Sequence, residues 1–211
     1  GGGGGGGRHN DKQLTSLLDT AASLVSQRRA HCESRQLASL LWACGKLGVH
    51  NAGLEDEVEA ATALHAHKFN PQELSNSIWG AARLNLDVRR DLVHRLASAI
   101  AASLEANSGV QAPAPRLGQG YGQGQWTAQG ISNVAWSLAT LGISSSSSND
   151  GGGGNGGGGG GGGGNGGGDR SYTPVLRAVC AAVKARASDF NPQEVANTLW
   201  AMARLSSAAA P

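Results

Sequence analysis

The chain has 211 residues, 34 of them glycine, and its 17 Lys and Arg against 15 Asp and Glu leave a formal charge of +2. So small a charge does not by itself indicate nucleic-acid binding. No run of about 18 apolar residues is present, so we expect no transmembrane helix and no membrane partner. The chain opens with glycines instead of methionine and shows no targeting segment, so we expect an internal region of a longer protein. Its three cysteines are scattered and include no Cys-x-x-Cys pair, so we expect neither a metal site nor a disulfide framework.

Four segments of the chain align with one another on a tryptophan, and the successive intervals between Trp42, Trp79, Trp136 and Trp200 are 37, 57 and 64. Leaving out the Gly/Gln/Pro-rich stretch 107–125 reduces the second interval to 38. Leaving out the Ser/Gly-rich stretch 144–169 reduces the third to 38 as well. The sequence therefore predicts a repeat of about 38 residues, interrupted by inserts that we expect to be disordered. The four segments are SRQLASLLWACGKL (34–47), PQELSNSIWGAARL (71–84), AQGISNVAWSLATL (128–141) and PQEVANTLWAMARL (192–205).

A second kind of apolar segment alternates with the tryptophan segments. In one of them, Leu92, Leu96, Ile100 and Leu104 recur every four residues, which is helical spacing. Each repeat is thus expected to be two helices, which we name A (with the tryptophan) and B. The sequence Asn-Pro-Gln-Glu at 70–73 and at 191–194 supplies an N-cap, a first-turn proline and a capping glutamate, which predicts the start of two A helices. The other two A segments lack that signal. The B helices are expected at 12–30, 54–67, 88–104 and 173–187.

The predicted fold class is all-α, an α-solenoid of two-helix repeats. Helices this short are marginal alone in water, so they would be stable only by stacking apolar faces on neighbouring units. The expected organisation is a disordered Gly-rich start at 1–11, helical repeats at 12–106, an insert at 107–125, the first helix of a repeat at 126–143, an insert at 144–169, and helical repeats at 170–211 that are cut off at the C-terminus.

Each A helix has distinct faces when drawn on a helical wheel. The positions five and one residues before the tryptophan, and two after it, are mostly apolar and share one arc. The position three after the tryptophan is always small, which would let a neighbouring helix approach closely. These small residues are Gly45, Ala82, Ala139 and Ala203.

Three polar positions form a separate stripe about 40° wide, seven and three residues before the tryptophan and four after it. Asparagine is unfavourable in mid-helix, so its recurrence on one face points to a role. Its amide both donates and accepts, which suits base edges or a peptide backbone, and a cation beside it suits phosphate. The stripe consists of Gln72, Asn76 and Arg83; Gln129, Asn133 and Thr140; and Gln193, Asn197 and Arg204, whereas the first A helix has Arg35, Ser39 and Lys46.

Each of these features also has a purely structural explanation. Arg83, Arg204 and Lys46 lie near helix C-termini, where the helix dipole favours cations. The asparagines would alternatively tie neighbouring helices together by hydrogen bonds to the backbone. We expect the tryptophans to pack at the shoulder of the core more than to serve as stacking platforms.

The strings FNPQELSNSIWGAARL (69–84) and FNPQEVANTLWAMARL (190–205) resemble the octotricopeptide-repeat proteins of algal organelles, relatives of FAST-kinase-like and RAP-domain proteins. The resemblance implies an α-solenoid in a chloroplast or mitochondrion. It also implies binding of single-stranded organellar RNA, together with other proteins of a ribonucleoprotein complex, in transcript stability, processing, splicing or translation. By that resemblance the base-reading surface would be Gln72, Asn76, Arg83, Gln129, Asn133, Gln193, Asn197 and Arg204.

No catalytic constellation emerges, so we expect a protein that is not an enzyme and needs no cofactor. His65 and His67 would point to opposite sides of a helix, which disfavours a metal pair. The glycine runs do not lead into Gly-Lys-Ser/Thr, which excludes a phosphate loop. The main alternative to RNA binding is an armadillo-like scaffold, in which Asn76 and Trp79 would grip the backbone of an extended peptide.

Overall fold

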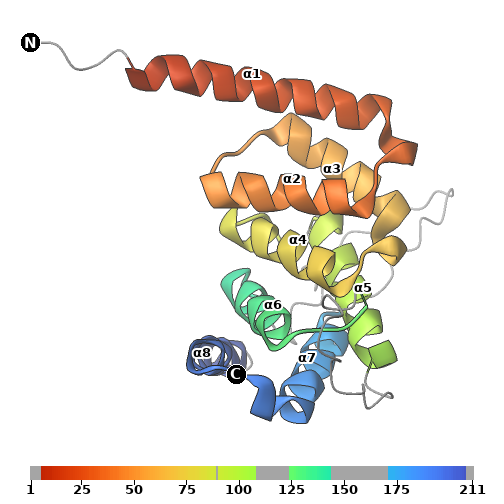
Figure 1. The fold of residues 1–211 in the computed structure, drawn as a ribbon, viewed down its shortest axis with the longest axis vertical. Coiled ribbons are helices and arrows are strands. Elements are labelled where there is room, and N and C mark those ends of the chain that lie inside the picture. The colour runs from red at the N-terminus through yellow and green to blue at the C-terminus, as the bar shows by residue number, and fades with distance from the viewer. Residues whose placement is uncertain (1–5, 89, 108–123, 144–170, 208–211) are drawn as a thin grey trace, which may run out of the picture.

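The structure, a computed structural model, describes residues 6–88, 90–107, 124–143 and 171–207 (Figure 1). These residues form α-helices and short 3-10 helices and contain no strand, which confirms the all-α class. The expected inserts at 107–125 and 144–169 lie almost entirely outside the described residues. The helices are α1 (Gly6–Gln27), η1 (Arg29–His31), α2 (Ser34–Leu47), α3 (Ala52–His65), η2 (Ala66–Lys68), α4 (Pro71–Arg83), α5 (Asp91–Asn107), α6 (Ala128–Thr140), α7 (Thr173–Ala185), η3 (Ala187–Asp189) and α8 (Pro192–Ser207).

The predicted helices correspond one to one with the observed α-helices. The A helices are α2, α4, α6 and α8, and the B helices are α1, α3, α5 and α7. The largest boundary difference is at α1, which begins at Gly6 instead of Lys12 and so extends into the stretch 1–11 that was expected to lack structure. Three of the B helices are followed by a short 3-10 turn that leads into the next A helix.

The starts of the A helices are fixed by side-chain caps. Asn70 Oδ1 accepts a hydrogen bond from the Glu73 amide at 2.9 Å, and Glu73 Oε2 accepts one from the Asn70 amide at 3.0 Å. Asn191 and Glu194 make the same pair of bonds in α8, so both predicted capping boxes are confirmed. In α6, Thr127 Oγ1 accepts from the Gly130 amide at 3.0 Å. Threonine is an ordinary N-cap, so this start was readable from the sequence without an asparagine.

The α-helices form two rows. In one row α2 contacts α4, α4 contacts α6, and α6 contacts α8; in the other, α1, α3, α5 and α7 contact one another in the same order. The pairs α2 and α3, α4 and α5, and α6 and α7 join the rows. Figure 1 shows α1 and α2 towards one end of the long axis and α7 and α8 at the other. The result is a helical repeat-like architecture in which the order of contacts follows the order of the chain.

The hydrophobic core lies between the two rows. The periodic side chains Leu92, Leu96 and Ile100 of α5 are completely buried, as their spacing predicted. Leu74 and Ile78 of α4 are buried to the same extent from the opposite row. Helices α4 and α5 therefore owe their stability to apolar stripes covered by their neighbours, because isolated helices of this length are marginal.

Neighbouring A helices approach to backbone contact where α2 meets α4. A Cβ built on Gly80 would lie 2.3 Å from the carbonyl oxygen of Leu41, so only glycine fits there. A Cβ on Gly45 would lie 2.8 Å from the Gly80 Cα. The close approach expected at Gly45 is therefore present, and the residue that faces Gly45 on α4 is Gly80.

The next two A–A interfaces share one hydrogen bond at equivalent positions. Ser75 Oγ of α4 donates to the Gly130 carbonyl of α6 at 3.3 Å. Ser132 Oγ of α6 donates to the Glu194 carbonyl of α8 at 3.2 Å. Both serines lie four residues before their tryptophan, and both carbonyls lie six residues before theirs. The two interfaces are thus built to the same pattern.

Candidate nucleic-acid interface

The polar stripe lies on the side of the A row that faces away from the B helices. Because the apolar positions turn towards the other row and towards neighbouring A helices, the stripe is left at the surface. None of its residues is sealed in the core. The glutamines Gln72, Gln129 and Gln193 are exposed, the asparagines Asn76, Asn133 and Asn197 are half-buried, and the arginines Arg83 and Arg204 are exposed.

The tryptophans border this stripe. Trp79 and Trp136 are half-buried, whereas Trp42 and Trp200 leave 43% and 42% of their surface exposed. The rings of Trp42 and Trp79 lie 6.4 Å apart with an interplanar angle of 31°, so they pack against each other across the α2–α4 interface. This agrees with the expected shoulder position and also leaves aromatic surface next to the stripe.

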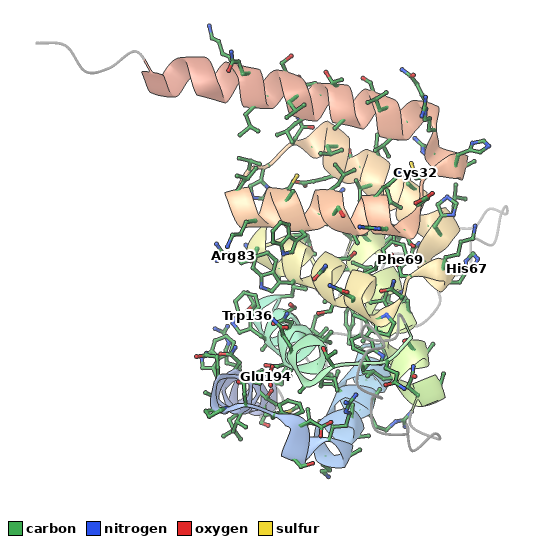
Figure 2. The ribbon with its side chains drawn as sticks, viewed as in Figure 1. Cys32, His67, Phe69, Arg83, Trp136 and Glu194 are labelled. Carbon is green, nitrogen blue, oxygen red and sulfur yellow. The ribbon has the colours of Figure 1, made fainter. Side chains whose placement is uncertain are left out.

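Each arginine of the stripe lies over the tryptophan one turn before it. The Arg83 Cζ is 5.9 Å from the centre of the Trp79 ring, and the Arg204 Cζ is 5.2 Å from that of Trp200. Cation–π attraction at this range holds a guanidinium near the ring. Figure 2 shows Arg83 and Trp136 on the same side of the molecule. The arginines therefore have an observed role besides the helix dipole, while both remain exposed.

The stripe asparagines do not tie the A helices together. Between the described residues, no hydrogen bond involves the side-chain amide of Asn76 or Asn133. The bonds between neighbouring A helices come instead from Ser75 and Ser132, the residues just before them. In α8, Asn197 Oδ1 accepts from Gln193 Nε2 at 3.0 Å, within the stripe itself. Two half-buried amides are therefore left with donors and acceptors to offer.

Charge is divided between the two rows. The A helices contain two carboxylates, Glu73 and Glu194, and each receives a backbone N–H bond in its capping box. The same four helices carry the cations Arg35, Lys46, Arg83 and Arg204. The acidic residues of α3, by contrast, lie in the B row, so the four A helices by themselves carry a net charge of +2, from four cations and two carboxylates.

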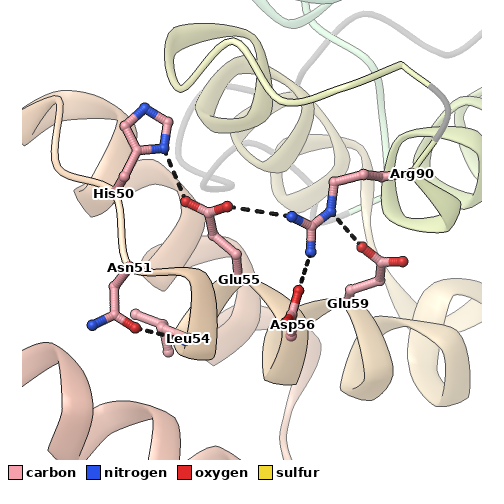
Figure 3. A network of polar contacts seen from close by, with 7 residues as sticks. All are labelled: His50, Asn51, Leu54, Glu55, Asp56, Glu59 and Arg90. Carbon is pink, nitrogen blue, oxygen red and sulfur yellow. Dashed lines mark hydrogen bonds and ion pairs between the residues drawn. The ribbon is translucent and has the colours of Figure 1, made fainter.

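The Arg90 side chain forms ion pairs with three acidic residues of α3 (Figure 3). Arg90 Nε lies 2.7 Å from Glu59 Oε2, Arg90 Nη2 lies 2.5 Å from Asp56 Oδ1, and Arg90 Nη1 lies 3.4 Å from Glu55 Oε2. Partial burial is the largest single influence on the pKa of Arg90 and lowers it, but the hydrogen bonds to Glu59 and Asp56 and the charges of these two carboxylates together leave the pKa above its usual value. Arg90 therefore links the start of α5 to α3. Nearby, Arg29 pairs with Glu57.

The described residues offer little to a metal or a small ligand. No group of three or more His, Cys, Asp or Glu among them is arranged to hold a metal ion. A hollow of about 280 Å³ in the B row is lined by residues of α3 and α5, among them Asp56, Glu59 and Arg95, away from the stripe. His65 is buried with its Nε2 3.0 Å from the Arg29 carbonyl oxygen, whereas His67 is exposed, so the two do not converge. Within the described parts of the chain, no helix is both long and apolar enough to cross a membrane.

Comparison of the chain with protein-family models, with curated proteins and with solved structures finds no match. The arginine–tryptophan pairs were not foreseen, although their spacing of four residues is the spacing at which helix side chains are neighbours.

Proposed function

We propose that the chain is an α-solenoid of two-helix repeats, each of the length set by the tryptophan spacing, that binds single-stranded RNA along the outer surface of its A helices. The fold part of this proposal is supported by the two A–A interfaces that share a hydrogen bond at equivalent positions, from Ser75 and from Ser132. The spacing of the tryptophans and the resemblance of 69–84 and 190–205 to octotricopeptide repeats support it independently.

One observation carries the RNA part of the proposal: the amides of Asn76 and Asn133 are at the surface and hold no partner among the described residues. A mid-helix asparagine costs helix stability, so a structural role would show as a bond to the neighbouring helix. Serine makes that bond instead. The amides are thus free to pair with base edges, as helical-repeat proteins do when each repeat presents two or three side chains to one base.

The cations set the strength of binding. In the proposed complex Arg83 and Arg204 contact phosphate while the amides between them read bases. For single strands the logarithm of the binding constant falls with the logarithm of salt by about 0.7 per phosphate neutralised. The four cations of the A helices therefore limit that slope to about 3. The chain binds weakly, does no chemistry and acts in organellar RNA metabolism, with other proteins of a ribonucleoprotein complex.

The test is a fluorescence-anisotropy titration against a set of labelled single-stranded RNAs. Replacing Asn76, Asn133 and Asn197 by alanine should flatten the differences in affinity between sequences. A matched control replaces three polar residues of the B helices, Gln13, Gln27 and Asn107, and should leave those differences unchanged. Sequence preference that survives the asparagine changes would remove the amides from any reading role.

The rival function is the armadillo-like scaffold that grips an extended peptide. Free asparagine amides serve a peptide backbone as well as a base edge. Capture of partners on the immobilised chain, with and without ribonuclease, separates the two functions. Partners lost on ribonuclease treatment support RNA binding, whereas partners that stay bound, and are released by changes at Asn76 and Trp79, support the scaffold.

A further inference from the structure

The face of each A helix that contacts the following A helix is left open in α8. This forward face comprises the residues four and one before the tryptophan and three after it. It is identified by the Ser75 and Ser132 bonds and by the contact of Leu41 with Gly80. In α2, α4 and α6 this face is buried. Its residues are Ala38, Leu41 and Gly45 in α2, Ser75, Ile78 and Ala82 in α4, and Ser132, Ala135 and Ala139 in α6. In α8 the equivalent Ala196, Leu199 and Ala203 are exposed, Leu199 by 65%.

The opposite face is left open in α2. This rear face comprises the residues two before the tryptophan and one and five after it, and Gly80 identifies it by its contact with the preceding helix. In α4 this face consists of Ser77, Gly80 and Leu84, and in α6 of Val134, Ser137 and Leu141, and all six residues are buried. In α2, Leu47 is 62% exposed, while Leu40 and Ala43 are half-buried.

The B row is open at the same end. Leu17 and Leu24 of α1 lie seven residues apart, on one side of the helix, and are 64% and 51% exposed. At the other end of this row, Leu176 and Val183 of α7 are only half-buried. Each end of the structure thus presents one A helix with exposed apolar side chains beside one B helix, whose apolar side chains are exposed in α1 and half-buried in α7.

We propose that these two ends bind each other, so that copies of this chain associate head to tail. The described helices alternate from B to A, starting with α1 and ending with α8. A second copy that places its α1 on α7 and its α2 on α8 therefore continues both rows in order. The internal α4–α6 interface is the template for the contact, with Leu199 of one copy in the place of Ile78 and Ala43 of the other in the place of Ser137, which is buried there with its Cβ. An alanine fits at that position, since Ala201 occupies it in α8.

This contact joins two different surfaces, so each bound copy leaves one end of each kind free for a further copy. A head-to-tail interface without rotational closure produces open chains of growing length. The proposal concerns the ends of the rows and is independent of the RNA-binding surface along their side.

Sedimentation velocity over a wide range of protein concentration, after ribonuclease treatment, tests it. The chain should exceed its 21.3 kDa monomer mass increasingly as concentration rises. Leu199→Glu, which blocks the α8 end, and Leu47→Glu, which blocks the α2 end, should each be monomeric alone. Mixed together they should form a one-to-one dimer and nothing larger, because each retains the end that the other lacks. Leu64→Glu, at a leucine 50% exposed in α3 and outside both ends, should associate like the unmodified chain.

Three results would overturn the proposal: an unmodified chain that is monomeric at every concentration, a single variant that still self-associates, or a mixture of the two variants that stays monomeric. Self-association of a single variant would indicate a symmetric contact of one end with itself. Circular dichroism confirms that the variants are folded, and Leu199→Ser and Leu47→Ser repeat the test if a glutamate variant loses helical signal.

Discussion

The contact of α2 with α4 makes a sharp prediction for Gly80→Ala. In an open helix this change is stabilising, because alanine is favoured over glycine by about 1 kcal/mol. At Gly80 the added Cβ lies 2.3 Å from the Leu41 carbonyl oxygen, 2.6 Å from its carbon and 3.0 Å from the Trp42 nitrogen. All three are backbone atoms, so the helices themselves must separate.

The size of the effect follows from that separation. A contact of 2.3 Å must open by about 1 Å to become an ordinary one, and a gap of that size forfeits a quarter to a half of the dispersion energy of the atoms involved. Overpacking costs about 1–3 kcal/mol, and the upper part of that range, about 2–3 kcal/mol, applies here because backbone atoms must shift. After the gain in helix propensity, we expect a net loss of about 1–2 kcal/mol.

Urea unfolding followed by tryptophan fluorescence measures this loss, because Trp42 and Trp79 lie at the interface. With a slope of about 2 kcal/mol per molar urea, the midpoint should fall by about 0.5–1 M. Gly53→Ala is the control, since its Cβ meets only Asn51 Oδ1 at 3.5 Å, and its midpoint should stay level or rise. If Gly80→Ala raised the midpoint as an ordinary helix substitution does, the close approach of α2 and α4 would be refuted.

Three further predictions concern stability and reactivity. Ser75→Ala and Ser132→Ala should each lower the free energy of unfolding, measured in urea, by about 0.5–1 kcal/mol. This is the low range for a single hydrogen bond, because both hydrogen bonds are long. A loss at only one of the two sites would contradict the equivalence of the two interfaces. Arg90→Ala should lower stability by about 1–3 kcal/mol, because three neighbouring carboxylates lose their cation, and equal stability would show that the network contributes nothing. Burial, and secondarily the Glu55 charge, raise the pKa of the Cys44 thiol, so it keeps its proton above about pH 8.5, where the unfolded thiol ionises. Because folding favours the protonated thiol, its contribution to the stability of the folded chain is complete at lower pH and is lost as pH rises through the raised pKa. Ellman's reagent should therefore label exposed Cys180 well before buried Cys44. Equal labelling rates would contradict this prediction.

The sequence predicted the helices well because their signals are local. Capping residues such as Asn70 and Asn191 act within one turn, and the apolar period of α5 is a property of that helix alone. The missed cap at Thr127 was also local and was visible as a threonine before the helix. Only the start of α1, at Gly6 in a glycine-rich stretch, lay outside what local propensity indicates.

The contacts between helices were less accessible from the sequence. The small residue at Gly45 was predicted to allow close approach, but its partner Gly80 was not, because which residue faces it depends on how two helices are staggered. The bonds from Ser75 and Ser132 depend on the same stagger. The surface position of the stripe, by contrast, followed from the helical wheel once the apolar face was assigned.

RNA binding by the A helices is tested most directly by photo-crosslinking the chain to single-stranded RNA that contains 4-thiouridine and mapping the crosslinked residues by mass spectrometry. We predict crosslinks on the outer surface of α4, α6 and α8, at or beside the stripe and its tryptophans, and their loss when Arg83 and Arg204 are replaced by glutamate. Crosslinks confined to the B helices α3, α5 and α7, or binding that leaves the A helices unmodified, would contradict it.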